Sequence, residues 1–103
     1  ESPLRYIIPE KRGRLRAILV VHQMGMPCDL HAISVIATQH ALPIIEDAAC
    51  AIGSEYSEDN GQHWQNIGSP YGDIACFSFH PRKILTTGDG GMITLNSKKM
   101  YRN

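Results

Sequence analysis

The chain has 103 residues, and its composition, 43% hydrophobic and 19% charged, is typical of a globular domain. Ten basic residues balance ten acidic ones, so no excess of charge points to a nucleic acid or a membrane surface as a partner. No apolar run approaches the roughly 18 to 20 residues that a transmembrane helix needs. The composition therefore favours neither a membrane protein nor a nucleic-acid-binding protein.

The cysteines and the two ends of the chain bear on where the protein works. Cys28, Cys50 and Cys76 are an odd number and too few for a disulfide framework, which indicates reduced thiols in the cytoplasm. The N-terminal segment is polar and interrupted by prolines, so we expect no signal peptide. The chain does not begin with Met, and its last residues, LNSKKMYRN, have the pattern of the first turn of a helix. We expect the chain to be part of a larger protein.

The first third of the chain has the pattern of a leader, a strand and a helix. Residues 1–16 are irregular and read as a leader or linker. Residues 17–21 (AILVV) are wholly apolar, which is typical of a strand buried on both faces. Apolar residues then recur near helical spacing over 30–41, with Asp29 as the expected N-cap and Pro43 as the stop. The pattern predicts a helix over 30–41.

A second short buried strand, residues 43–47 (PIIED), follows this helix and ends in two carboxylates. Strand, helix and strand within about 30 residues form a βαβ unit, whose two strands run parallel with a right-handed crossover. In open α/β sheets, ligands bind at the edge formed by the carboxyl ends of the strands. His22 and Asp47 are expected at that edge.

The second half of the chain has two further strands after a polar excursion. Residues 53–72 are rich in turn formers, and Asn60-Gly61 is the strongest signal for a small hairpin. Residues 73–79 and 91–95 (GMITL) are the third and fourth predicted strands. These elements predict an α/β fold.

Polar residues near two strand ends are the candidates for chemistry. Because side chains alternate along a strand, Ser78 and His80 share one face, and Lys83 follows three residues on. The structural alternative is a satisfied hydroxyl, a hydrogen-bonded imidazole and a solvated loop lysine. A carboxylate such as Asp47 at the end of a buried strand is costly unless it is paired. Its structural alternative is an N-cap on a helix over 48–52.

Two segments of the sequence have part of the pattern of a ligand-binding motif, a zinc knuckle and a P-loop. Cys28-x-x-His31 has half the spacing of a zinc knuckle, but no second close pair completes it. Residues 86–91 (TTGDGG) lack the G-x-x-x-x-G-K-[ST] pattern of a P-loop, so these glycines are expected to serve a tight turn. We expect no metal site.

Three segments, in order, resemble the DegT/DnrJ/EryC1/StrS family of sugar aminotransferases. They are VHQMGMPCDLHAI, IIEDAACAIGSEY, and FSFHPRK followed by GDGGMIT, and the likeness spans residues 17–95. The resemblance implies the large domain of a fold type I pyridoxal phosphate enzyme, an α/β/α sandwich on a mostly parallel sheet. Residues 17–103 would form part of that domain, without the upstream phosphate loop and the C-terminal domain.

The resemblance also implies roles for four residues toward pyridoxal 5'-phosphate. Lys83 would bind the cofactor aldehyde covalently and later move a proton between the donor carbon and the cofactor. Asp47 would pair with the pyridine nitrogen, and Ser78 would donate to the phosphate. Cys50 stands where the family often has Gln or His, near the phenolic oxygen, and a thiol is a poorer hydrogen-bonding group than either.

The implied reaction transfers an amino group from an amino acid, expected to be glutamate, to a keto-sugar nucleotide. Family active sites are shared across a homodimer, so we expect the isolated 103-residue chain to be inactive. One alternative is a sugar dehydratase of the same fold, but those relatives typically replace the lysine with histidine. The other is a non-catalytic binding or regulatory homologue, against which the intact Asp47, Ser78 and Lys83 argue.

Overall fold

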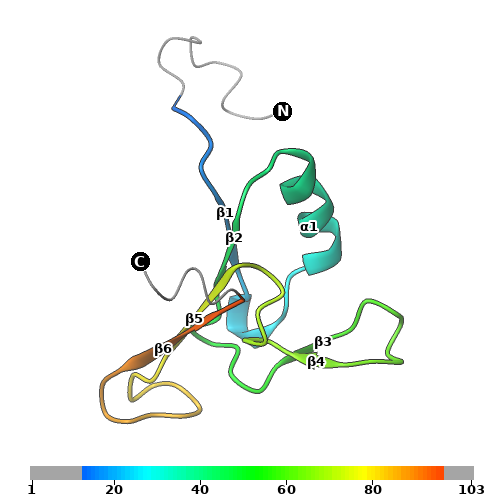
Figure 1. Ribbon diagram of the computed structural model, residues 1–103. Helices are drawn as coiled ribbons and strands as arrows, with labels where there is room; N and C mark the ends of the chain where they lie inside the picture. Colours follow the sequence, from blue (N-terminus) through cyan, green and yellow to red (C-terminus); the bar gives the residue numbers. More distant parts are fainter. Residues whose placement is uncertain (1–12, 97–103) are drawn as a thin grey trace.

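The computed structural model describes residues 13–96, which form a small sheet with one helix on it and a hairpin beside it (Figure 1). Residues 13–17 form neither helix nor strand, and the expected C-terminal helical turn and most of the leader lie outside the described residues. In chain order the elements are β1 Ile18–Val21, a single 3-10 turn Gln23–Gly25, α1 Leu30–Gln39, β2 Ile44–Asp47, β3 Glu55–Tyr56, β4 Gln65–Asn66, β5 Ile74–Ser78 and β6 Gly91–Leu95.

The sheet has the strand order β1-β2-β5-β6. Strands β1, β2 and β5 are parallel, and β6 pairs with β5 in the antiparallel direction. Helix α1 connects β1 to β2, as expected for a βαβ unit. The prediction of a mostly parallel α/β sheet is confirmed, and the four strands match the expected ranges to within one residue at each end.

The polar excursion between β2 and β5 contains the expected hairpin. Strands β3 and β4 pair antiparallel, with Glu55 opposite Asn66 and Tyr56 opposite Gln65. Between them, Asn60 and Gly61 both have positive φ, 56° and 88°. Asparagine and glycine tolerate this left-handed conformation at low cost, which explains why this dipeptide marks the turn. In Figure 1 the hairpin extends away from the four-stranded sheet.

Helix α1 covers one face of the sheet. Asp29 caps its N-terminus, since Oδ1 accepts a hydrogen bond from the Ala32 amide at 3.0 Å. The helix ends at Gln39, two residues before the expected end, because Ala41 adopts φ +50° and cannot continue it. The core beneath it consists of buried residues from the helix, the strands and the following turns: Val20, Leu30, Ala37, Ile44, Ala48, Ala51, Ile67, Ala75 and Phe77.

Two polar side chains, His22 and Glu46, are fully buried on the helix side of the sheet. The Cys28 amide donates to His22 Nδ1 at 3.1 Å, so Nε2 carries the hydrogen and donates to Glu46 Oε2 at 3.0 Å. The Gly72 amide donates to Glu46 Oε1 at 2.7 Å. One carboxylate therefore ties together the end of β1, strand β2 and the segment that leads into β5.

Candidate functional site

The carboxyl ends of the three parallel strands lie at one edge of the sheet, and two of the predicted site residues are there. Asp47 is the last residue of β2, and Ser78 is the last residue of β5. Because Glu46 faces α1, the alternation of side chains directs Asp47 to the opposite face. Asp47 and Ser78 line one cavity of about 290 Å³, together with Cys76 and Ala49. The structure thus brings the carboxylate and the hydroxyl to a common hollow.

Asp47 is half-buried and uses only part of its hydrogen-bonding capacity. Its Oδ1 accepts from the Ala49 amide at 3.1 Å. Residues 48–52 form turns and not a helix, so the alternative role of Asp47 as a helix N-cap is wrong. Within residues 13–96, Oδ2 has no donor, and this oxygen is available to a cationic group.

Ser78 has an unused donor. Its Oγ accepts from the His80 amide at 3.3 Å, and its hydroxyl hydrogen has no acceptor within the described part of the chain. The His80 side chain is exposed and turned to its own loop, where Nδ1 accepts from the Arg82 amide at 3.2 Å. Of these two residues, Ser78 lines the cavity of Asp47 and His80 does not.

Lys83 lies in a second cavity, of about 320 Å³, with Cys50, Arg82 and several apolar residues. The residue is half-buried, and its Nζ donates to the Sγ of the exposed Cys50 at 3.0 Å. Ala49 lines both this cavity and the cavity of Asp47 and Ser78. The four residues singled out in the sequence therefore lie in two adjoining hollows at the same end of the sheet.

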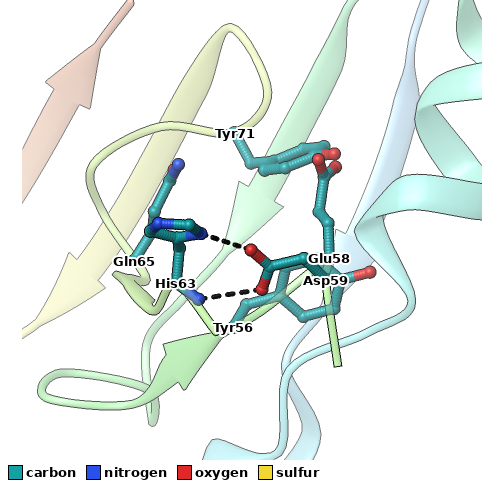
Figure 2. Close-up of a pocket in the computed structure, with 6 residues that line it drawn as sticks. All are labelled: Tyr56, Glu58, Asp59, His63, Gln65 and Tyr71. Atoms are coloured by element: carbon teal, nitrogen blue, oxygen red, sulfur yellow. Dashed lines mark hydrogen bonds and ion pairs between the residues drawn. The ribbon is translucent and has the colours of Figure 1, made fainter. Parts of the chain in front are cut away.

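A third pocket, of about 190 Å³, lies on the hairpin and contains none of these four residues (Figure 2). Its aromatic walls are Tyr56 and Tyr71, whose rings meet edge to face with centroids 5.7 Å apart. Asp59 lies at its rim and is bound by its own loop: Oδ1 accepts from the Ser57 hydroxyl and from the Gln62 and His63 amides, and Oδ2 contacts His63 Nδ1. Asp59 thus organises the hairpin loop.

These bonds predict a pH dependence of the loop. Hydrogen bonds from the His63 backbone and side chain, and then from the Ser57 side chain, lower the pKa of Asp59 from 3.8 to about 2. A carboxyl whose pKa is lower in the folded state than in the unfolded state stabilises the folded state at every pH above the unfolded-state pKa. We therefore expect the loop to be ordered at neutral pH and to loosen as the pH falls from 3.8 toward about 2. The fluorescence of Trp64, which donates to the Gly61 carbonyl in this loop, measures the change.

The control for this titration is a pair of substitutions. Asp59→Asn should give the loosened Trp64 signal already at neutral pH, whereas the exposed Glu58→Gln should leave the wild-type titration in place. An Asp59→Asn protein with the same Trp64 emission and the same acid response as wild type would contradict this role of Asp59.

The described residues contain neither a group of side chains that could bind a metal nor a helix that could span a membrane. Within residues 13–96, no three His, Cys, Asp or Glu side chains are grouped so that they could hold a metal ion, and Cys28 and His31 form no such group. Over the same residues, no helix combines the length and the apolar character that crossing a bilayer requires.

Residues 4–103 match the DegT/DnrJ/EryC1/StrS aminotransferase family. Since this match covers nearly the whole sequence, the chain belongs to that family, and the resemblance drawn from the three motifs is confirmed. The match begins earlier than the motifs indicated, at residue 4 rather than 17. The enzymes of this family are sugar aminotransferases that depend on pyridoxal phosphate.

Among similar proteins is the GDP-perosamine synthase of Escherichia coli O157:H7, 42% identical over 89 residues, which are 86% of this chain and 22% of that protein. Another is the UDP-N-acetyl-3-dehydro-alpha-D-glucosamine 3-aminotransferase of Acidithiobacillus ferrooxidans, which is 44% identical over 90 residues. These residues are again 86% of this chain and 22% of that protein. The chain therefore spans about a fifth of the length of these relatives.

Solved structures show the same fold. The S. venezuelae aminotransferase DesV, crystallised in complex with a ketimine intermediate, superposes with a TM-score of 0.72 at 39% identity, over 84% of this chain and 22% of that one. An aminotransferase from Psychrobacter cryohalolentis superposes with a TM-score of 0.72 at 35% identity, over 84% of this chain and 20% of that one. The chain carries part of the fold of a pyridoxal phosphate aminotransferase, as predicted.

Proposed function

We propose that residues 17–103 form part of the cofactor-binding large domain of an aminotransferase, which moves an amino group from an amino acid to a keto-sugar nucleotide. One observation supports this most directly: an amine, a carboxylate and a hydroxyl lie in two adjoining cavities at the carboxyl end of a parallel sheet. The names of the relatives, both of which refer to sugars, support the substrate class. Glutamate is the proposed amino donor.

The chemistry of these side chains fits pyridoxal phosphate. Lys83 supplies a primary amine for the aldehyde, and its Nζ is held by a thiol and not by a carboxylate. The oxygen Oδ2 of Asp47 has no donor within residues 13–96 and can pair with the pyridine nitrogen. The hydroxyl hydrogen of Ser78 is likewise available to a phosphate oxygen. Each of these three groups matches one part of the cofactor.

The residues of this chain would divide the work as follows. When bound, the cofactor supplies the electron sink for the carbanion that forms when the amino donor loses its α-proton. Asp47 stabilises positive charge on the ring nitrogen and so keeps this sink effective. Lys83 anchors the cofactor and afterwards serves as the base and acid that moves the proton. Ser78 orients the phosphate through a charge-assisted hydrogen bond.

We further infer a homodimer with shared active sites and a cytoplasmic location. The dimer is an inference from the family. The location is supported by Cys28, Cys50 and Cys76, which are all free thiols, as expected in a reducing compartment.

A half-reaction tests the proposed activity. The full-length protein that contains this chain, loaded with pyridoxal phosphate, should convert glutamate to 2-oxoglutarate once per site, with loss of the visible absorbance as the cofactor takes up the amino group. Adding UDP-N-acetyl-3-dehydro-alpha-D-glucosamine, the sugar in the name of one relative, should restore the absorbance if this sugar class is the acceptor. A protein that binds the cofactor but never releases 2-oxoglutarate would refute the transfer from glutamate.

A further inference from the structure

We propose that Cys50 is a positioning residue for Lys83, and that its thiol holds the lysine amine in the cofactor-free site. The proposal rests on the proposed function, because it concerns the step in which the Lys83 amine nitrogen bonds to the cofactor's aldehyde carbon and one water leaves. The observation behind it is the hydrogen bond from Lys83 Nζ to Cys50 Sγ at 3.0 Å, which joins residues that lie 33 positions apart in the chain.

The backbone that carries the thiol is fixed by close packing. Ala48 and Ala51, on either side of Cys50, are fully buried, and the Ala51 amide donates to the Ala48 carbonyl at 2.9 Å. The 3-10 turn after β1 packs closely on the backbone of Cys50, because a Cβ added to Gly25 would lie only 2.9 Å from the Cys50 carbonyl oxygen. The Ser54 hydroxyl holds the Gly25 carbonyl at 2.6 Å. The backbone that carries the Cys50 side chain is therefore a rigid turn.

The loop that carries the amine is fixed by its own hydrogen bonds. The Lys83 amide donates to the His80 carbonyl at 2.9 Å, and the Arg82 amide donates to His80 Nδ1 at 3.2 Å. The Thr86 hydroxyl donates to the Phe79 carbonyl at 2.8 Å, which ties the loop back to the end of β5. With both backbones held, the thiol and the amine meet through the choice of side-chain rotamers alone.

A thiol is suited to holding an amine that must later react. Sulfur is a weak acceptor, so it orients Nζ with little resistance to its departure. A carboxylate in the same position would form a strong charge-assisted hydrogen bond and would favour the unreactive ammonium. No Asp or Glu side chain lines this cavity within the described part of the chain. Cys50 thus restricts the flexible Lys83 side chain without making its amine unreactive.

The test measures how fast the cofactor-free full-length protein attaches pyridoxal phosphate at Lys83, followed by visible absorbance and confirmed by borohydride trapping. Cys50→Ala should slow attachment roughly 3- to 10-fold, because the released lysine regains rotamer freedom that it must lose again before it reacts. Cys50→Ser, which keeps a small acceptor, should restore most of the rate. Cys28→Ala is the matched control, because the Cys28 thiol donates to the Val21 carbonyl at 3.0 Å and does not contact Lys83.

The outcomes separate this proposal from the proposed function. An unchanged rate in Cys50→Ala, or a Cys50→Ser protein as slow as Cys50→Ala, would overturn the positioning role while the wild type still attaches the cofactor. A wild-type protein that attaches none at Lys83 would overturn both. Equal far-ultraviolet circular dichroism in all variants establishes that the rates compare folded proteins, as expected for the exposed Cys50 side chain.

Discussion

Lys83→Ala should reduce the conversion of glutamate to 2-oxoglutarate by roughly 10³-fold or more. The lysine amine is the group proposed to move the proton from the donor, and positioned acid–base groups contribute about 10²- to 10⁴-fold on their own. The same substitution removes the covalent anchor of the cofactor. The measurement is single-turnover formation of 2-oxoglutarate at saturating pyridoxal phosphate, so that weaker cofactor binding does not contribute.

Two controls separate the amine from its charge. Lys83→Arg keeps a positive charge but should be as inactive as Lys83→Ala, because a guanidinium does not deprotonate to serve as base or nucleophile. Added ethylamine should restore part of the proton transfer in Lys83→Ala, since a small amine fits the space that the side chain leaves. Substantial activity in Lys83→Arg without added amine would contradict the role assigned to Lys83.

Glu46→Ala should lower the free energy of unfolding by about 2–5 kcal/mol, because it leaves two buried donors without an acceptor, at about 1–3 kcal/mol each. Glu46 accepts from both His22 and the Gly72 amide, and neither donor could reach solvent after the substitution. Denaturant unfolding of the purified protein measures the loss.

The control is an acidic residue outside the core. Glu58 lies on the hairpin with its side chain 44% exposed, and Glu58→Ala should change stability by no more than about 0.5 kcal/mol. Glu46→Gln should fall between the two, because its amide replaces one acceptor oxygen with a donor that faces another donor. A Glu46→Ala protein as stable as Glu58→Ala would show that the buried pair does not support the fold.

The main elements of the fold could be predicted because their signals are local. Short apolar runs identified the long strands, Asp29 marked the start of α1, and Asn60-Gly61 marked the hairpin. The end of α1 could not be predicted from its apolar pattern, because it depends on the left-handed conformation of Ala41. Strand ends were within one residue, since the apolar runs and the ladders of hydrogen bonds nearly coincide.

The site could be predicted only in part. The βαβ pattern put Asp47 at the carboxyl edge of the sheet and the family motif singled out Ser78; in the structure both line the same cavity. The bond between His22 and Glu46 was missed, although alternation already put Glu46 on the same face as Ile44, because pairing across strands also requires their register. The contact of Cys50 with Lys83 was missed because it depends on how two separate turns fold.

Where pyridoxal phosphate attaches is the most direct test of the central claim. The full-length protein is incubated with the cofactor, reduced with borohydride, digested and analysed by mass spectrometry. We predict one reduced pyridoxyl adduct, on Lys83, and a yellow protein before reduction. A colourless protein with no adduct, or an adduct on another lysine while Lys83 stays unmodified, would contradict the account.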